Sequence, residues 1–492
     1  MNSINSQRTI AVIVAFFAVM LLVTNAASAA VTVSTAATQN MSCSGGVCSP
    51  TAANAVLNVG DLTSMLASSN VTVNTGTGSL PAQVEDIIVA ATFNWASVNA
   101  LTLDAYRSVT FTAPVAVNGA APVSLTTDDG GSGGSLSFTS GGSLSFLGTT
   151  NNLSIDGKDY ALENTLATLV AAIKHKKSGH YALSTNYDAG NDGTYKASPI
   201  TTKFKGTLNG LGNTISSLAI KDTSPTIGLF SYVAKGGTVV SLQVAGANVQ
   251  VGPGTSAGVV AGVNYGTLFN VFASGQITGG IGQDTPSVLG GLIGDNVGTL
   301  IDSSSNTTVS ATGRSKNPGF VDVGGLAGEN SGTIGESYAT GGASVSGQTV
   351  STFLGGLVGF NNGPIVGCYA NGATTTALAA HVGGLIGENA QTVSQSYSIG
   401  LVSGGAGSVL GGLIAYDGSA PGSLTNTYWD ITTSGITNLS QGAGSPANDP
   451  GITGETTAQL QSGLPPGFDP TIWAENSLIN NGLPYLIANP PQ

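Results

Sequence analysis

The sequence predicts an all-β fold, a right-handed parallel β-helix with one short helix near residues 160–177 and a C-terminal capping segment. Composition is the first observation behind this prediction. The chain has 492 residues, of which 72 are glycine, 41% are hydrophobic and only 8% are charged. Glycine destabilises helix interiors, and exposed helix faces normally carry charge, so this composition argues against a helical enzyme. It also argues against a disordered chain, which combines low hydrophobicity with high charge.

The second observation is a repeated phrase in the second half of the chain. Its copies are GGLIGDN (290–296), GGLAGEN (324–330), GGLVGFN (355–361) and GGLIGEN (383–389), with weaker copies at 257–264 and 411–417. An Asn and then a Ser or Tyr follow at constant offsets, in the sets Gly291-Asn296-Ser304, Gly325-Asn330-Tyr338, Gly356-Asn361-Tyr369 and Gly384-Asn389-Tyr397. Constant offsets with variable connections are typical of stacked solenoid coils. We therefore expect the Asn side chains to hydrogen-bond, and the Tyr rings to stack, from coil to coil.

The remaining elements follow from local periodicity. Residues 76–157 alternate apolar and polar side chains between Gly and Asn turns, which indicates short strands. Apolar residues recur at helical spacing from Tyr160 to Lys177. Lys174, Lys176 and Lys177 fall in the last turn of this helix, where cations favour the helix dipole. We prefer this capping role to a basic binding patch.

The repeats resemble the GLUG motif repeats of bacterial filamentous-haemagglutinin-like surface and secreted proteins. The stretches at 204–220 and 180–189 look like the start of such arrays, and TNTYWD (425–430) and NNGLPYL (480–486) resemble their C-terminal ends. The strands of 76–157 are similar to the degenerate repeats of haemagglutinin-type exoproteins. The resemblance implies a β-helix and a surface or secreted protein.

These patterns divide the chain into six segments. The predicted segments are a signal peptide (1–29), an N-terminal segment (30–75), haemagglutinin-like repeats (76–157), a helix with the first strand (158–200), GLUG-type repeats (201–430) and a C-terminal cap or tail (431–492).

The N-terminus predicts export from the cytoplasm. Arg8 precedes an apolar run from Ile10 to Val23, and Ala27-Ser28-Ala29 forms a cleavage site. This run is shorter than the ~20 residues of a membrane anchor, so a cleaved signal and no transmembrane span in the mature chain are expected. We expect an extracellular or cell-surface location, with the periplasm as the alternative. The net charge of −12 argues against nucleic acid as a partner.

The three cysteines fit an exported protein. Cys43 and Cys48 can close a small disulfide loop in an oxidising compartment. Cys368 lies inside a repeat and is interpreted as a small packed side chain. No cysteine or histidine cluster has metal-ligand spacing, and we expect no metal and no cofactor.

Catalytic motifs are weak. The GGSGG run at 130–134 matches a nucleophile-elbow pattern, but the sequence around it predicts a loop between strands rather than a strand-turn-helix. Asp295, Glu329 and Glu388 occupy equivalent positions in three repeats, with Phe360 in the intervening one. Such acids could serve a polysaccharide lyase or hydrolase, but a solvated column of carboxylates is the simpler interpretation.

The sequence therefore predicts a non-enzymatic, adhesin-like scaffold that attaches to glycan, matrix or other cells through its repeat faces and loops. Many weak contacts along a solenoid add through multivalency. Arg314 and Lys316, in the longest loop, are the predicted contacts for an anionic glycan or matrix component, against the alternative of a tolerated insertion. Two other functions remain open: a polysaccharide-degrading enzyme, and a self-associating structural protein of a biofilm or surface layer.

Overall fold

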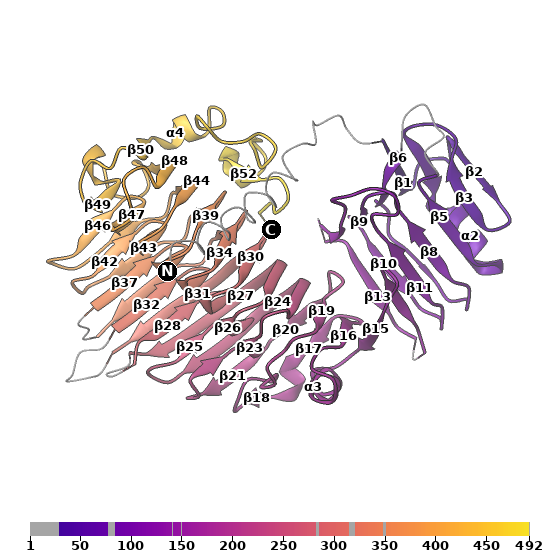
Figure 1. Ribbon diagram of the computed structural model, residues 1–492, viewed down its shortest axis with the longest axis horizontal. Helices are drawn as coiled ribbons and strands as arrows, with labels where there is room; N and C mark the ends of the chain where they lie inside the picture. The colour runs from indigo at the N-terminus through magenta and orange to yellow at the C-terminus, as the bar shows by residue number, and fades with distance from the viewer. Residues whose placement is uncertain are drawn as a thin grey trace, which may run out of the picture. The chain divides into compact units, whose positions relative to one another are not determined.

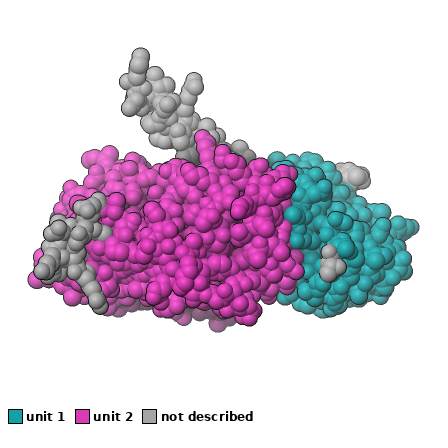
Figure 2. Space-filling model, turned by 90° about the horizontal axis from the view of Figure 1, so that it is seen from below, with its two compact units in different colours: residues 1–162 teal, residues 163–492 magenta. Residues whose placement is uncertain are grey.

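The computed structural model describes residues 29–491, apart from 77–83, 140, 149, 282–284, 314–319 and 348–350. Within this range the chain is almost entirely β-structure (Figure 1). It divides into two compact units, Met1–Leu162 and Glu163–Gln492 (Figure 2). The predicted signal sequence up to Ser28, and the predicted contact residues Arg314 and Lys316, lie outside the described residues.

The first unit is a parallel solenoid whose chain visits three sheets in rotation. Sheet A contains, in spatial order, β4 (Ala55–Asn58), β1 (Ala29–Ser34), β6 (Val84–Val89), β9 (Val109–Phe111) and β12 (Leu136–Phe138). Sheet C contains β7 (Phe93–Trp95), β10 (Pro114–Val117) and β13 (Ser143–Phe146). Sheet B contains β3 (Val47–Pro50), β5 (Val71–Asn74), β8 (Leu101–Asp104), β11 (Val123–Thr126) and β14 (Leu153–Ile155), with β2 (Met41–Ser44) and β15 (Lys158–Glu163) as antiparallel flanking strands. Residues 30–75, predicted as a separate segment, thus contribute strands to the same sheets as the following repeats.

A helix that the sequence analysis did not predict replaces a strand in the first unit. Helix α2 (Val59–Ser68) connects β4 to β5 and buries Leu62 and Leu66. The Asn58 side chain accepts hydrogen bonds from the backbone amides of Gly60 and Asp61 and caps the helix start. An Asn followed by two Leu residues four positions apart is a helix signal, but the segment is short and rich in small residues.

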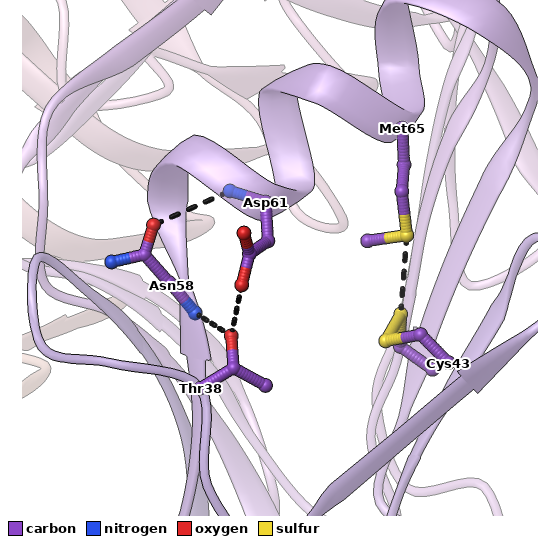
Figure 3. Close-up of a disulfide and its surroundings, with 6 residues drawn as sticks. Thr38, Cys43, Asn58, Asp61 and Met65 are labelled. Carbon is purple, nitrogen blue, oxygen red and sulfur yellow. Dashed lines mark hydrogen bonds between the residues drawn. A yellow bond between two sulfur atoms is a disulfide. The ribbon is translucent and has the colours of Figure 1, made fainter.

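The disulfide between Cys43 and Cys48 joins β2 to β3 beside this helix (Figure 3). Cys48 is fully buried, and its sulfur lies 3.9 Å from the Met65 sulfur on α2. At the start of the helix, the Thr38 hydroxyl donates to the Asp61 carboxylate at 2.5 Å. The disulfide and this hydrogen bond hold the first hairpin and the segment before it against the helix.

The predicted helix near 160–177 is present but shorter. Helix α3 (Leu166–His175) begins after Thr165, whose hydroxyl accepts from the Thr168 amide at 3.1 Å. The expectation that it starts at Tyr160 is wrong, because Tyr160 pairs with Leu153 across the β14–β15 hairpin. Strand formation therefore outweighs helical periodicity over the first four residues, which belong to β15. Lys174 lies in the last helical turn, as expected, whereas Lys176 is the C-cap residue and Lys177 lies beyond the helix.

The second unit is a longer parallel solenoid that contains the predicted repeats. Sheet F contains β22 (Thr226–Ile227), β25 (Ser256–Ala257), β28 (Ser287–Gly290), β32 (Phe320–Gly324), β37 (Ser351–Gly355), β42 (His381–Gly383) and β46 (Val409–Gly411). Sheet E contains β23 (Phe230–Val233), β26 (Ala261–Asn264), β29 (Ile293–Asn296), β33 (Ala327–Asn330), β38 (Val358–Asn361), β43 (Ile386–Asn389), β47 (Ile414–Asp417) and β49 (Ala443–Ser445). Each GGL phrase is the corner between a strand of sheet F and the next strand of sheet E.

Sheet D closes the solenoid, and each coil contributes one to three strands to it. Its strands are β16 (His180–Leu183), β17 (Tyr187–Asp188), β18 (Thr194–Tyr195), β19 (Thr207–Asn209), β20 (Thr214–Ser216), β21 (Ala219–Asp222), β24 (Thr238–Val251), β27 (Thr267–Gly280), β30 (Thr299–Ile301), β31 (Ser304–Thr312), β34 (Thr333–Gly335), β35 (Tyr338–Ala339), β36 (Ala343–Ser346), β39 (Ile365–Val366), β40 (Tyr369–Ala370), β41 (Thr374–Thr376), β44 (Val393–Ser398), β45 (Val402–Ser403), β48 (Leu424–Asp430) and β50 (Ile452–Glu455). The tail then adds α4 (Thr457–Leu460), β51 (Trp473–Ala474) and β52 (Tyr485–Leu486). The solenoid strands therefore run to Glu455, and the covering tail follows them.

The glycine pairs at the F–E corners are required by close packing between coils. A Cβ atom added to Gly291 would lie 2.1 Å from the carbonyl oxygen of Gly325, and one added to Gly325 would lie 2.2 Å from that of Gly356. No side chain fits at such distances from a backbone oxygen, so each of these corners must be glycine for the next coil to stack on it. Leu, Ile and Val side chains fill the interior behind these corners.

Candidate ligand-contact surface

A continuous chain of hydrogen-bonded asparagines runs through the second unit. Asn264 donates to Asn296, Asn296 to Asn330, Asn330 to Asn361 and Asn361 to Asn389, each at 2.7 or 2.8 Å between amide nitrogen and oxygen. Asn389 donates to the Asp417 carboxylate at 2.7 Å, which ends the series on an acceptor. All five asparagines are fully buried. They hold coils together and are closed to a ligand.

The repeated tyrosines also form a column, but a different part of the chain covers it. The rings of Tyr338, Tyr369 and Tyr397 stack with centroids 4.8 and 5.1 Å apart. Phe468 and Trp473 of the tail pack against this column, and the Tyr397 hydroxyl donates to the Pro484 carbonyl at 2.6 Å. Figure 1 shows the tail in yellow beside β39 and β44. The Tyr column is therefore a docking face for the chain's own C-terminal segment.

Cys368 lies in a third buried column. It occupies the position held by Ser303, Ser337 and Ser396 in neighbouring coils, and its thiol donates to the Val366 carbonyl at 3.3 Å. Burial raises the pKa of this thiol to about 12. Cys368 therefore replaces a structural serine, and at neutral pH it stays protonated and unreactive.

The outer positions next to the F–E corners form a surface of a different kind. We call it the F/E stripe. It comprises Tyr232, Asp295, Asp322, Glu329, Phe353, Phe360, His381, Glu388 and Tyr416, together with Tyr265, which follows β26 and whose ring stacks on Tyr232. The predicted acids Asp295, Glu329 and Glu388 lie in one column of sheet E, with Phe360 between the last two. The stripe joins this column to side chains of sheet F.

The sheet F members of the stripe were not identified from the sequence. Asp322, Phe353 and His381 are in register with one another on neighbouring strands. Each lies seven residues before the sheet E residue that it accompanies, at 329, 360 and 388. This constant offset was present in the sequence, but only the corner geometry shows that the two columns are neighbours.

Aromatic rings occupy both ends of the stripe. Tyr232 and Tyr265 stack at one end with centroids 5.0 Å apart. At the other end, Phe353 lies 5.8 Å from Phe360 and 5.4 Å from His381, whose ring stacks on Tyr416 at 5.5 Å. Tyr265 and Tyr416 are 42% and 39% exposed. A ligand can therefore reach these rings from solvent.

Carboxylates occupy the middle of the stripe. Burial raises the pKa of Asp322 to about 8, with a further increase from the charges of Glu329 and Glu388. Burial also raises the pKa of Asp295 to about 6, again with Glu329 adding to the shift. The Glu388 carboxylate lies 3.2 Å from Nδ1 of His381. Asp295 and Asp322 thus lie beside other acids, without enough nearby positive charge to stabilise their ionised forms.

The arrangement can be compared with what hydrolysis of a glycosidic bond requires. That reaction uses one protonated and one ionised carboxyl group across a sugar-sized gap. Asp322 remains protonated at neutral pH, but it is only 7% exposed.

The GGSGG run, the other weak catalytic signal, lies in the turn between β11 and β12 with no helix after it, as the loop interpretation expects.

Two features are absent from the described part of the chain. None of its helices has the length and apolar character needed to cross a bilayer. Across the same residues, no group of three or more His, Cys, Asp or Glu side chains is placed to hold a metal ion.

The geometry defines a parallel β-helix repeat protein with buried polar and aromatic columns and one mixed outer stripe. No protein-family model matches this chain. A stretch of 163 residues, 31% of the chain, is 32% identical to Halomucin from Haloquadratum walsbyi, and the match spans 2% of the length of Halomucin. Among solved structures, an IgA1 protease is similar over 57% of this chain and 23% of its own, with 16% identity and a TM-score of 0.39.

Proposed function

We propose that this protein is an exported, adhesin-like β-helix scaffold of the GLUG-repeat, filamentous-haemagglutinin-like type, which attaches to glycan, matrix or other cells. The observation that supports attachment is the F/E stripe. It leaves aromatic rings and carboxylates partly exposed along several coils, whereas the buried columns beside it are uniform. The Cys43–Cys48 disulfide supports an oxidising, non-cytoplasmic location.

Attachment by such a scaffold is multivalent. A solenoid presents similar groups at regular intervals, so several weak contacts with one long ligand add together. The loop that contains Arg314 and Lys316 is proposed as a separate contact for an anionic partner. Because both residues lie outside the described range, this part of the proposal rests on the sequence alone.

The decisive experiment combines localisation with attachment. The full chain is expressed in a bacterial host, and the medium, periplasm and outer surface are separated and probed. Beads coated with the purified protein are then tested for binding to cells and to immobilised polysaccharides. We expect export and saturable attachment. Retention in the cytoplasm, or beads that bind no better than albumin-coated beads, would overturn the proposal.

The raised carboxyl pKa values in the stripe favour one alternative, a polysaccharide-degrading enzyme. Release of reducing sugar or unsaturated product from acidic polysaccharides tests it directly. Turnover that disappears in Asp295→Ala or Glu329→Ala would replace the adhesin proposal with the enzyme. Self-association of the purified protein without attachment to cells or glycan would instead favour a structural role in a biofilm or surface layer.

A further inference from the structure

We propose that the F/E stripe binds a cationic amino-sugar chain, a polymer of glucosamine-type residues with free amino groups, lying along the solenoid axis. This inference deepens the proposed attachment function and rests on it. It commits the stripe to one ligand chemistry, which follows from its rings, its carboxylates and its spacing.

The rings account for the sugar. Flat aromatic side chains bind the apolar C–H faces of pyranose rings and also attract cations. The stripe has such rings at both ends, Tyr232 with Tyr265 at one and Phe353, His381 and Tyr416 at the other. Because the outermost rings are about two-fifths exposed, a chain laid along the stripe can contact them without unfolding any strand.

The carboxylates account for the positive charge. Oδ1 of Asp295 is buried and has no hydrogen-bond partner among the described residues. Asp322 is more than nine-tenths buried, and its neighbours in the stripe are the acids Glu329 and Glu388. Among the described lysines and arginines, Lys203 contacts the stripe, and it lies over the Tyr232 ring at 4.8 Å, at one end. An ammonium group bound between Asp295 and Glu329 would compensate charges that the protein leaves unpaired.

The same carboxylates exclude an anionic glycan. A uronic acid or sulfated chain on the stripe would place negative charge against Asp295, Glu329 and Glu388, which is unfavourable in a partly buried surface. A fully acetylated chain would fit the rings but would offer no cation to the acids. The expected order of affinity is therefore free amine, then N-acetyl, then uronic acid.

The repeat spacing favours a sugar chain over a basic peptide. Neighbouring strands in a sheet are about 4.8 Å apart, close to the length of one pyranose residue. Each sugar therefore advances the chain by about one coil, and in a β-1,4-linked chain, where alternate residues are turned over, the amino groups on one face recur at about every second coil. An extended peptide places side chains on one face every ~6.6 Å and loses register after one or two coils. Oligolysine matches the charge of the stripe but not its period.

Calorimetric titration of the full chain at pH 7 tests the proposal. The probes are the glucosamine hexamer, the N-acetylglucosamine hexamer, the galacturonic acid hexamer and hexalysine. We expect the glucosamine hexamer to bind at least tenfold more tightly than any other probe. If hexalysine binds equally tightly, the stripe recognises positive charge alone and not the sugar. If the N-acetylglucosamine or galacturonic acid hexamer binds equally tightly, the carboxylates do not select for a free amino group. Each result would overturn the proposal.

Variants place the binding on the stripe. Glu329→Gln removes one carboxylate, and Phe353→Ala removes the ring between Phe360 and His381. We expect each to weaken glucosamine-hexamer binding about tenfold. The matched controls are Asp159→Asn on β15 and Leu439→Ala, which alter an exposed acid and an exposed apolar side chain elsewhere and should leave binding unchanged.

Circular dichroism and chemical unfolding verify that each variant is folded, and Glu329→Gln is the milder change if Phe353→Ala fails to fold. Unchanged binding in folded Glu329→Gln would overturn the assignment to the stripe. Attachment of coated beads to cells without any hexamer binding would overturn this inference and leave the proposed function standing. Binding of the glucosamine hexamer by a protein that is never exported would support this inference and overturn the proposed function.

Discussion

Adjacent residues on the strands of sheet E behave in opposite ways. At one position the sequence is Asn in five successive coils, from Asn264 to Asn389. At the position immediately before it, the residues are Val263, Asp295, Glu329, Phe360, Glu388 and then Tyr416. The first column is fully buried, and most of the second is partly exposed.

The contrast shows which interaction restricts the sequence. Each central Asn must accept one hydrogen bond from the coil before it and donate one to the coil after it, and water cannot replace either partner. The neighbouring position contacts solvent and the sheet F column, so it accepts an acid or an aromatic ring. Uniformity marks the scaffold, and variation marks the surface available to a ligand.

The strongest way to test the contrast is to interrupt the asparagine chain. In Asn330→Ala the buried amide of Asn296 loses its acceptor at 2.8 Å and keeps only the Thr333 carbonyl at 3.3 Å. The buried side-chain oxygen of Asn361 loses its donor at 2.8 Å and keeps only the Gly363 amide at 3.4 Å. We expect a loss of roughly 2–5 kcal/mol in unfolding free energy, since each of these two buried groups loses its short hydrogen bond, at a cost of about 1–3 kcal/mol per group. Denaturant unfolding measures it. The control Asp417→Asn retains the acceptor that ends the chain and should be nearly neutral, so equal losses in both variants would contradict the ladder.

The second test uses pH. The pKa of Asp322 is about 8 in the folded protein against 3.8 as the ordinary value, so between these pH values the folded state holds a proton that the unfolded state has lost. Stability therefore falls as pH rises from about 4 to about 8. We expect roughly 1–3 kcal/mol less stability at pH 8 than at pH 5, and a smaller difference in Asp322→Asn. An equal pH dependence in both proteins would show that Asp322 is ionised throughout.

A third test compares two rings of the tyrosine column. The Tyr397 hydroxyl donates to Pro484 in the tail, whereas the Tyr369 hydroxyl is buried and has no hydrogen-bond partner in the described chain. Tyr397→Phe should cost about 1 kcal/mol and make the tail more susceptible to proteolysis. Tyr369→Phe should be neutral or slightly stabilising, and a larger loss there than at Tyr397 would contradict the hydrogen-bond assignment.

The smallest effect is expected on the stripe itself. Phe360→Glu gives the intervening coil the acid found in its neighbours and removes one ring contact with Phe353. Because the position is partly exposed, we expect a change below about 1 kcal/mol in unfolding free energy, as for most surface substitutions. A loss comparable to that of Asn330→Ala would show that the asparagine column and the column before it both support the scaffold. The two columns would then not differ in their role.

Much of the second unit could be predicted because its repeats carry their own register. The constant offsets from Gly291, Gly325, Gly356 and Gly384 predicted which asparagines and tyrosines would align. Helix α3 was predicted from its periodicity, with the wrong start. Helix α2 was missed because its signal covers only ten residues. The strand order of sheet A was not predictable either, because β1 lies between β4 and β6 although it precedes both in the chain.

The sequence by itself determined the class of fold, because its glycines and apolar residues recur in register. Stacked β-coils bury these apolar residues and have corners that require glycine. Only the tertiary structure decided which columns are open to solvent. Asp322 became a neighbour of Glu329 through the turn of each coil, and the tail covered Tyr397 from more than 80 residues away. The physical reason is that repeat spacing encodes contacts between equivalent positions in successive coils, whereas contacts across a corner or with the tail depend on how the chain bends.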